Sequence, residues 1–197
     1  MSQEILDRKC PGCGAPVTIN TNECKYCGRE IEITTFNSVY SMPAPMVNRY
    51  VGYYKNELQT DPEDKGVNKA IGICFLKLHL YSKAAEAFDK AVIDNFDDSE
   101  SYFYYAVCVL NGKKAFLNPR SNIDKALEYI NAALMIEPRG IYYYFMAYIK
   151  YDFFARKSYR TTPDYMECLN NAISVGVSNT DIQMLYEMIG VSRPECL

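Results

Sequence analysis

The segment 68–96 constrains the fold most strongly, because apolar and small side chains recur in it with helical spacing on both sides of a short break at residues 79–82. This spacing predicts two helices whose apolar sides face each other. Gly72 and Ala84 allow the helices to approach closely, and Phe88 fills the space toward a neighbouring pair. One hairpin cannot bury its own apolar face, so further hairpins are expected. The residues that carry the pattern are Ile71, Gly72, Phe75, Ala84, Phe88 and Ala91.

Two more hairpins are expected downstream, each with a lengthened turn. The second has an extra segment at about residues 111–122, and the third, which matches less completely, has one at about residues 154–163. Lys150 stands in the third hairpin where a large apolar residue is expected. The second hairpin is indicated by Tyr102, Tyr105, Ala106, Val109, Ala126, Ile130, Ala133 and Pro138, and the third by Tyr143, Met146, Ala147, Leu169 and Ala172.

The order and spacing of these residues resemble tetratricopeptide repeats, in which helical pairs stack with a period of about 34 residues. The resemblance covers about residues 68–177. It implies a mainly α fold: an α-solenoid of about three helical hairpins with flanking helices. The pattern in residues 46–59 predicts a helix ahead of the stack. Residues 181–189 predict a last helix that starts near Thr180, stops at Gly190 and closes the open end of the stack.

In proteins similar to this one, the first helix of each pair lines a groove that suits an extended peptide or a partner helix. Tyrosine fits such contacts because it offers a large area and a hydroxyl group. The tyrosines here lie on all sides of their helices, so some are expected in the core. So many tyrosines also allow the protein to associate with itself through the groove. A clamp for acidic chaperone C-termini is disfavoured, because Ile73 and Tyr104 stand where that clamp has asparagine. The resemblance implies a partner-binding groove lined by Lys69, Ile73, Phe103, Val107, Leu110, Asn111, Tyr144, Tyr148 and Tyr151.

Ahead of the repeats, four cysteines form two C-x-x-C pairs separated by ten residues. Two such pairs suit a tetrahedral zinc ion, because each places two sulfurs on one tight turn. Gly14 and Gly28 directly follow the pairs and can take a positive φ, which turns backbone N–H groups toward the sulfurs. The pattern resembles a zinc ribbon or a rubredoxin-like pair of knuckles, with strands expected at residues 17–19 and 31–34. The expected ligands of a structural zinc are Cys10, Cys13, Cys24 and Cys27.

Iron in the same ligand set and a pair of redox-active dithiols are the alternatives to zinc. A redox dithiol of the thioredoxin type needs a βαβ context, which the sequence lacks. Four cysteine ligands leave no open coordination position, so the metal is expected to stabilise a module of about 30 residues that is too small to fold by burial alone. The expected division is a zinc ribbon at residues 1–34, a linker at 35–45 and a helical repeat domain at 46–197.

The composition fits a soluble globular protein: the chain has 197 residues, 49% of them hydrophobic, and a formal net charge of −3. Residues 1–9 are charged and lack the apolar core of a secretory signal. No apolar run approaches the roughly 20 residues of a membrane span. Eight cysteines without a secretory signal favour metal binding or free thiols in a reducing compartment, so a cytoplasmic location is expected.

Catalytic motifs are scarce. The single histidine, His79, lies in a predicted turn without a nucleophile signature beside it, and phosphate-binding loop motifs are lacking. The expected function is therefore a non-catalytic adaptor that binds a peptide or a partner helix in the repeat groove. One alternative is a nucleic-acid-associated protein that uses the ribbon and two basic loops; another is metal- or redox-responsive signalling through the four cysteines. The basic residues of the loops are Lys113, Lys114, Arg120, Arg156, Lys157 and Arg160.

Overall fold

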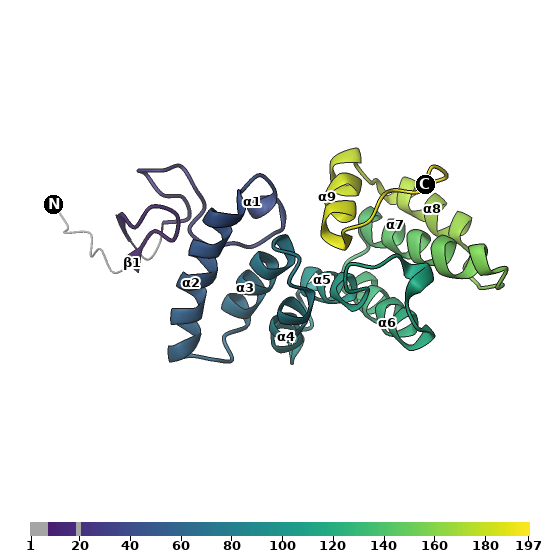
Figure 1. The fold of residues 1–197 in the computed structure, drawn as a ribbon, viewed down its shortest axis with the longest axis horizontal. Helices are drawn as coiled ribbons and strands as arrows, with labels where there is room; N and C mark the ends of the chain where they lie inside the picture. Colours follow the sequence, from purple (N-terminus) through teal and green to yellow (C-terminus); the bar gives the residue numbers. More distant parts are fainter. Residues whose placement is uncertain (1–7, 19–20) are drawn as a thin grey trace.

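Three helical hairpins, stacked in one row, make up most of the chain in a computed structural model that describes residues 8–18 and 21–197. The two helices of each hairpin pack on each other, and the second helix of one hairpin packs on the first helix of the next (Figure 1). The predicted fold class, mainly α with a small N-terminal sheet, is confirmed. The hairpins are α3 (Lys65–Lys77) with α4 (Tyr81–Val92), α5 (Ser99–Val109) with α6 (Arg120–Ile136), and α7 (Gly140–Ile149) with α8 (Tyr165–Val175).

Small residues set the distance between the helices of a pair. A Cβ atom added at Gly72 would lie 2.9 Å from the ring of Phe88, so the fully buried ring occupies the space that a side chain would take. In the third pair, a Cβ atom at Gly140 would overlap the carbonyl oxygen of Gly176. The close approach predicted for the first pair from Gly72 therefore recurs at the other end of the row.

The two predicted extra segments lie against each other. The first contains the 3-10 turn η1 (Ala115–Leu117). The second contains the 3-10 turn η3 (Ala155–Lys157) and directly follows the π-helical turn η2 (Lys150–Phe154), which extends α7. The Phe116 amide donates a 2.8 Å hydrogen bond to the carboxylate of Asp152. Lys150 is buried, although it is charged, and its ammonium group donates to the Thr161 hydroxyl at 2.5 Å. Both segments therefore emerge on the same edge of the row.

A long helix, α2 (Ala44–Thr60), packs on α3, in agreement with the helix predicted at residues 46–59. The segment 35–45, expected to be a linker, contains the short helix α1 (Asn37–Tyr40). Phe36 and Val39 in this segment are buried against the repeats. We call residues 33–42 the strap, because they lie across the row of helices.

The last helix, α9 (Asn179–Ile189), begins with a capping box between Ser178 and Asp181 and ends at Gly190, whose φ of 66° is left-handed. The N-cap is thus Ser178, two residues before the predicted Thr180. The prediction that this helix closes the open end of the row is wrong. It packs instead on α7 and α5, because the aromatic side chains of α7 offer its apolar stripe a large partner surface. We call the face formed by α3, α5 and α7 the first-helix face; α1 and α9 lie on the same side of the row (Figure 1).

The N-terminal module, described at residues 8–18 and 21–34, contains a two-stranded antiparallel sheet of β1 (Arg8–Lys9) and β2 (Pro16–Val17). Part of the strand predicted at residues 17–19 lies outside the described residues. The strand predicted at residues 31–34 is wrong, because this part of the chain is irregular. The Ile33 amide is satisfied by the hydroxyl of Tyr54 on α2, at 2.8 Å, in place of a neighbouring strand.

None of the helices in the described part of the chain combines the length and hydrophobicity that crossing a membrane requires.

Candidate metal centre and interaction surface

Four cysteine sulfurs converge in the N-terminal module. All four Sγ atoms lie within 4.8 Å of one another, and two pairs, Cys10 with Cys27 and Cys13 with Cys24, are 3.7 Å apart. A zinc ion bound to four thiolates at about 2.3 Å requires sulfurs about 3.8 Å apart, the edge of the tetrahedron. A disulfide would need about 2.05 Å. The donor set therefore fits a tetrahedral metal ion, and the four predicted ligands are the residues that the fold brings together.

Each C-x-x-C pair sits on the same kind of turn. The amide of Gly14 donates a 2.8 Å hydrogen bond to the carbonyl of Cys10, and the amide of Gly28 donates one of the same length to the carbonyl of Cys24. Both glycines have left-handed φ angles, 78° and 61°, as the sequence predicts. These turns aim backbone N–H groups at the sulfurs, which stabilises thiolates.

The thiols of the cluster differ in acidity because of these contacts. Burial raises the pKa of Cys10 to about 12 against the opposing effect of the Cys13 and Gly12 amides. At Cys24, burial also raises the pKa, but the amides of Tyr26 and Cys27 outweigh it and lower the value to about 7. A divalent cation at the centre would deprotonate its thiol ligands outright. Its positive charge would then offset the negative charge of the four thiolates.

Three side chains of α2 hold the module against the repeats. Arg49 donates a 3.1 Å hydrogen bond to the carbonyl of Gly12, inside the first C-x-x-C pair. Tyr50, fully buried, donates a 2.6 Å hydrogen bond to the carbonyl of Glu30, just beyond the second pair. Together with Tyr54, these contacts fix the backbone on both sides of the cysteine cluster. The module is therefore docked on α2 and does not hang free.

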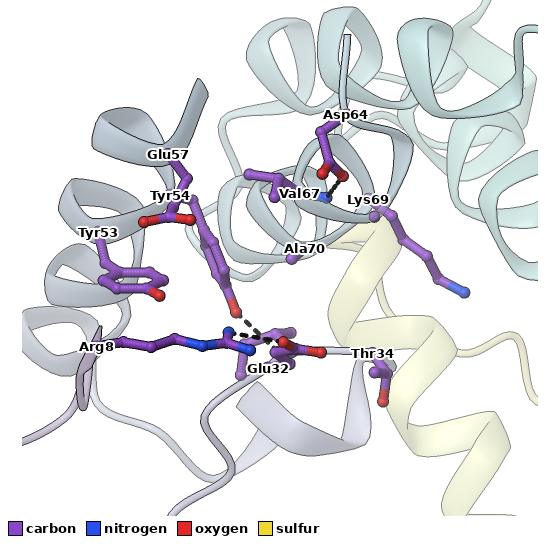
Figure 2. A pocket seen from close by; sticks show the side chains of 12 residues that line it. Arg8, Glu32, Thr34, Tyr53, Tyr54, Glu57, Asp64, Val67, Lys69 and Ala70 are labelled. Atoms are coloured by element: carbon purple, nitrogen blue, oxygen red, sulfur yellow. Dashed lines mark hydrogen bonds and ion pairs between the residues drawn. The ribbon is translucent and has the colours of Figure 1, made fainter. Parts of the chain in front are cut away.

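A pocket of about 280 Å³ marks the joint between the module, α2 and α3 (Figure 2). Its charged groups are largely committed to local contacts: Arg8 forms a 2.8 Å ion pair with Glu32, and Asp64 caps α3 by accepting from the Val67 amide at 2.9 Å. Lys69 points away from Arg8 in this view. The pocket thus lies at the contact between the module and the first helices of the repeat domain, and its charged residues serve that contact.

The first-helix face is covered, which differs from the open groove expected from the sequence. The strap and α9 both lie on it, and their buried side chains belong to the same core as those of the face. An apolar surface of this size is unstable in water, so the chain itself covers it. The predicted groove residues that are buried are Ile73, Phe103, Val107, Leu110, Tyr144 and Tyr148.

The remaining three predicted groove residues lie at the edges of this face. Lys69 forms ion pairs with Asp98 at 2.8 Å and Glu100 at 3.0 Å, so its charge is neutralised within the chain. Asn111 is exposed in the turn after α5, where its φ is 51°. Tyr151 is half-buried, and its ring lies 5.3 Å from that of Tyr165.

A cleft of about 230 Å³ lies on the first-helix face, between the strap and α9. Its floor consists of aromatic rings from α5 and α7; Phe103 and Tyr142 have ring centroids 4.8 Å apart. Burial raises the pKa of Tyr142 to about 12, so its hydroxyl stays protonated and shares a 3.0 Å hydrogen bond with Ser99. We call this space the cleft; it is lined by Thr35, Phe36, Asn37, Glu100, Phe103, Tyr104, Arg139, Ile141, Tyr142, Asp181, Met184 and Met188.

Two charged residues of the cleft, Arg139 and Glu100, are paired within the chain. Arg139 contacts Glu100 at 2.7 Å and Glu137 at 2.8 Å. Glu100 also contacts Lys69, so one carboxylate joins two cations from neighbouring hairpins. The cleft thus presents an apolar floor with a polar rim, where Arg139 and Glu100 neutralise each other and the Asp181 carboxylate accepts hydrogen bonds from Ser178. The floor favours an apolar side chain as the occupant.

The two basic loops are partly engaged within the chain. Arg120 pairs with Asp124, Arg156 pairs with Asp152, and the Lys157 ammonium lies 3.7 Å from the ring centroid of Phe153. Cations held in this way contribute less to phosphate binding than free ones, so these loops do not favour a nucleic-acid function.

Comparisons with known proteins bear on the fold. No protein family matches the sequence, and no curated protein matches it either. Among solved structures, the chain is similar to MamA MSR-1 C2, with a TM-score of 0.53 and 16% identity over 71% of this chain and 72% of that chain. MamA contains tetratricopeptide repeats. The fold is tetratricopeptide-repeat-like. The likeness shows the fold alone, and it agrees with the resemblance found in the sequence.

Sequence reasoning missed two parts of this tetratricopeptide-repeat-like surface. The segment 35–45, which contains most of the strap, reads as a linker because it has two prolines and no helical period, although Phe36 and Val39 are apolar and buried. Met184 and Met188 line the cleft from a helix assigned to the end of the stack. Their spacing of four residues on α9 was a signal of an apolar face, but not of where that face packs.

Proposed function

We propose that this protein is a non-catalytic adaptor that binds a peptide or a partner helix on its first-helix face, with the cleft as the entry point. The cleft is the observation that carries the proposal. It is smaller than the roughly 300 Å³ at which small-molecule sites begin, so it fits one or two side chains of a peptide. Tetratricopeptide-repeat-like folds are typically non-catalytic, which agrees with this role.

The metal in this proposal is a structural zinc held by Cys10, Cys13, Cys24 and Cys27. Zinc with four thiolates has no open position, so it stabilises the module and does not activate water. Free thiols suit a reducing compartment, and we place the protein in the cytoplasm for that reason. The proposed parts are the zinc module at residues 1–34, the connecting segment at 35–45, which holds most of the strap, and the repeat domain at 46–197.

Capture from native lysate tests the adaptor function. Ile141→Glu places a carboxylate at the partly exposed apolar wall of the cleft, and Ile173→Glu makes the same change at a 65% exposed position on α8. We expect the wild type and Ile173→Glu to capture the same protein and Ile141→Glu to lose it, with helicity and metal content unchanged in all three. Capture that survives Ile141→Glu but disappears with nuclease treatment would contradict the adaptor and favour a nucleic acid.

A further inference from the structure

The helix α9 occupies the first-helix face as a ligand would. Its apolar stripe of Ile182, Leu185 and Ile189 is buried, with spacings of three and four residues. Amphipathic helices that bind grooves use this spacing for their anchor residues. The face of α3, α5 and α7 is therefore shaped for a helix, and the chain supplies one.

One ion pair fixes the register of α9 on the face. Lys77, on α3, contacts the Glu187 carboxylate and also donates a 2.6 Å hydrogen bond to the carbonyl of Tyr40 in the strap. Lys77 thus ties α9 and the strap to the same helix. Any helix that replaces α9 in this register needs a carboxylate at the position of Glu187.

The fit of α9 is imperfect in its polar contacts. The hydroxyls of Tyr81, Tyr144 and Tyr186 are buried, and none of them makes a hydrogen bond of regular geometry with the described residues; those of Tyr144 and Tyr186 lie close to each other. All three lie at this interface: Tyr186 belongs to α9, its ring lies edge-on to that of Tyr144, and the Tyr81 hydroxyl lies beside Gly190. A buried hydroxyl without a partner destabilises the arrangement that buries it.

The helix α9 is also built as a separate unit. It has its own capping box at Ser178 and its own left-handed terminator at Gly190, so its helical hydrogen bonds are completed without its neighbours. It is joined to α8 through Gly176, whose φ of 98° is left-handed. Displacing α9 therefore breaks its side-chain contacts with the face, and those of the C-terminal segment that follows it, but none of the backbone hydrogen bonds within the hairpins.

We propose that α9 is an intramolecular competitor for a partner's amphipathic helix. This inference rests on the proposed adaptor function and specifies the partner. The partner helix has apolar residues at the positions of Ile182, Leu185 and Ile189 and a carboxylate at the position of Glu187. In place of Tyr186 it has a side chain that accepts a hydrogen bond from Tyr144. A tethered helix acts at high effective concentration, so α9 keeps weak binders off the face.

A fluorescent peptide with the sequence of residues 178–190 serves as the probe, because its fit to the face is known. In the full-length chain, Glu187→Lys removes the ion pair with Lys77 and places two lysines side by side. We therefore expect α9 to leave the first-helix face more often. We expect the probe to bind this variant about tenfold more tightly than the wild type, a factor that corresponds to about 1.4 kcal/mol. Glu187→Gln, which removes the pair without repulsion, gives a smaller gain.

The matched control is Glu128→Lys, the same charge change at an exposed position of α6. It should bind the probe as the wild type does. A probe that itself carries Glu187→Lys should not bind, because it meets Lys77 as a like charge. Equal binding of the two probes, or no gain in Glu187→Lys over Glu128→Lys, would overturn the proposal. Dimers of the wild type that excess probe dissociates would also overturn it, because α9 of a second copy would then be the occupant of the face.

The two proposals can fail separately. If Ile141→Glu abolishes capture from lysate while the probe does not distinguish the Glu187 variants, the adaptor stands and the competitor role of α9 falls. If the probe behaves as expected while no protein depends on the cleft, the face is a helix receptor and the adaptor function falls.

Discussion

The backbone amide of Phe36 donates a 3.0 Å hydrogen bond to the hydroxyl of Tyr104, 68 residues further along the chain. Both residues are buried, and both line the cleft. Burial raises the pKa of Tyr104 well above its usual range, so the hydroxyl stays neutral and available to this amide. This contact ties the strap to the floor of the cleft.

Tyr104→Phe should therefore loosen the strap. It leaves the Phe36 amide buried without an acceptor, which destabilises the fold by about 1–2 kcal/mol. Urea unfolding measures the loss, and hydrogen exchange at residues 36–40 should accelerate. Tyr81→Phe is the control: it removes a buried hydroxyl that has no partner among the described residues, so stability should stay level or rise slightly. A larger loss for Tyr81→Phe than for Tyr104→Phe would show that the strap contact is not the cause.

Removing the metal should act beyond the module. Mass spectrometry should find one zinc per chain in the wild type and in Cys196→Ser, whose cysteine is exposed outside the cluster, and none in Cys24→Ser. A chelator should release the backbone that Arg49 and Tyr50 hold, because a module of this size lacks a sufficient core. Hydrogen exchange should then accelerate at residues 21–42 and stay slow in α5 to α7. Full zinc loss without a change in the strap would refute this coupling.

Gly72→Ala should destabilise the first hairpin by about 1–3 kcal/mol, because the added methyl group meets the ring of Phe88. Gly52→Ala is the matched change on α2, where an added Cβ atom has no neighbour within 4 Å among the described residues. It should stabilise the chain by about 0.5–1 kcal/mol, as alanine does for glycine in a helix. Thermal unfolding of both variants compares them, and a tolerated Gly72→Ala would mean that Phe88 can shift.

Low pH should weaken the ion pair between Lys69 and Asp98, which joins the first two hairpins. Burial raises the pKa of this carboxyl, but the hydrogen bonds from Lys69 and Ser101 outweigh burial and lower it below its usual value. The unfolded pKa is about 3.9, so the stabilisation is present above about pH 4 and is lost as the pH falls through the lower folded value. Asp98→Asn should lower the free energy of unfolding by about 1–2 kcal/mol at pH 7, and the difference should shrink toward pH 2.

Asp124→Asn provides the control for that titration. Its carboxylate pairs with Arg120 four residues away on the exposed side of α6. Exposed pairs of this kind contribute about 0.3–0.5 kcal/mol. A pH dependence as large for Asp124→Asn as for Asp98→Asn would indicate a general acid effect and not the Lys69 contact.

The parts of the fold that follow from local periodicity are predictable from the sequence. In the hairpin around Gly72 and Phe88, the small and apolar residues recur in successive helical turns of the sequence. Each C-x-x-C pair is directly followed by the glycine that its turn requires. Both appear in the structure where the sequence places them. The helix at residues 46–59 is found for the same reason, since its apolar stripe repeats over four turns.

The position of α9 and of the strap depends on surfaces that no local pattern encodes. The spacing of Tyr144 and Tyr148 in the sequence is the same whether they face an open groove or a covering helix, so it does not distinguish the two arrangements. The side that α9 covers follows from the aromatic area that α7 offers, which is a property of the assembled row. The strand expected at residues 31–34 fails for a similar reason, because the Tyr54 hydroxyl, 21 residues away, takes the role of a pairing strand.

The order of the helices along the chain has a consequence for synthesis. Chains grow from the N-terminus at roughly 5–20 residues per second, and about 14 residues separate the end of α8 from the end of α9. For roughly one to three seconds of translation, the first-helix face is complete but its covering helix is not. During that interval the nascent chain contains the aromatic side chains of α5 and α7 without the helix that covers them, which makes this surface a binding site for chaperones that act near the ribosome.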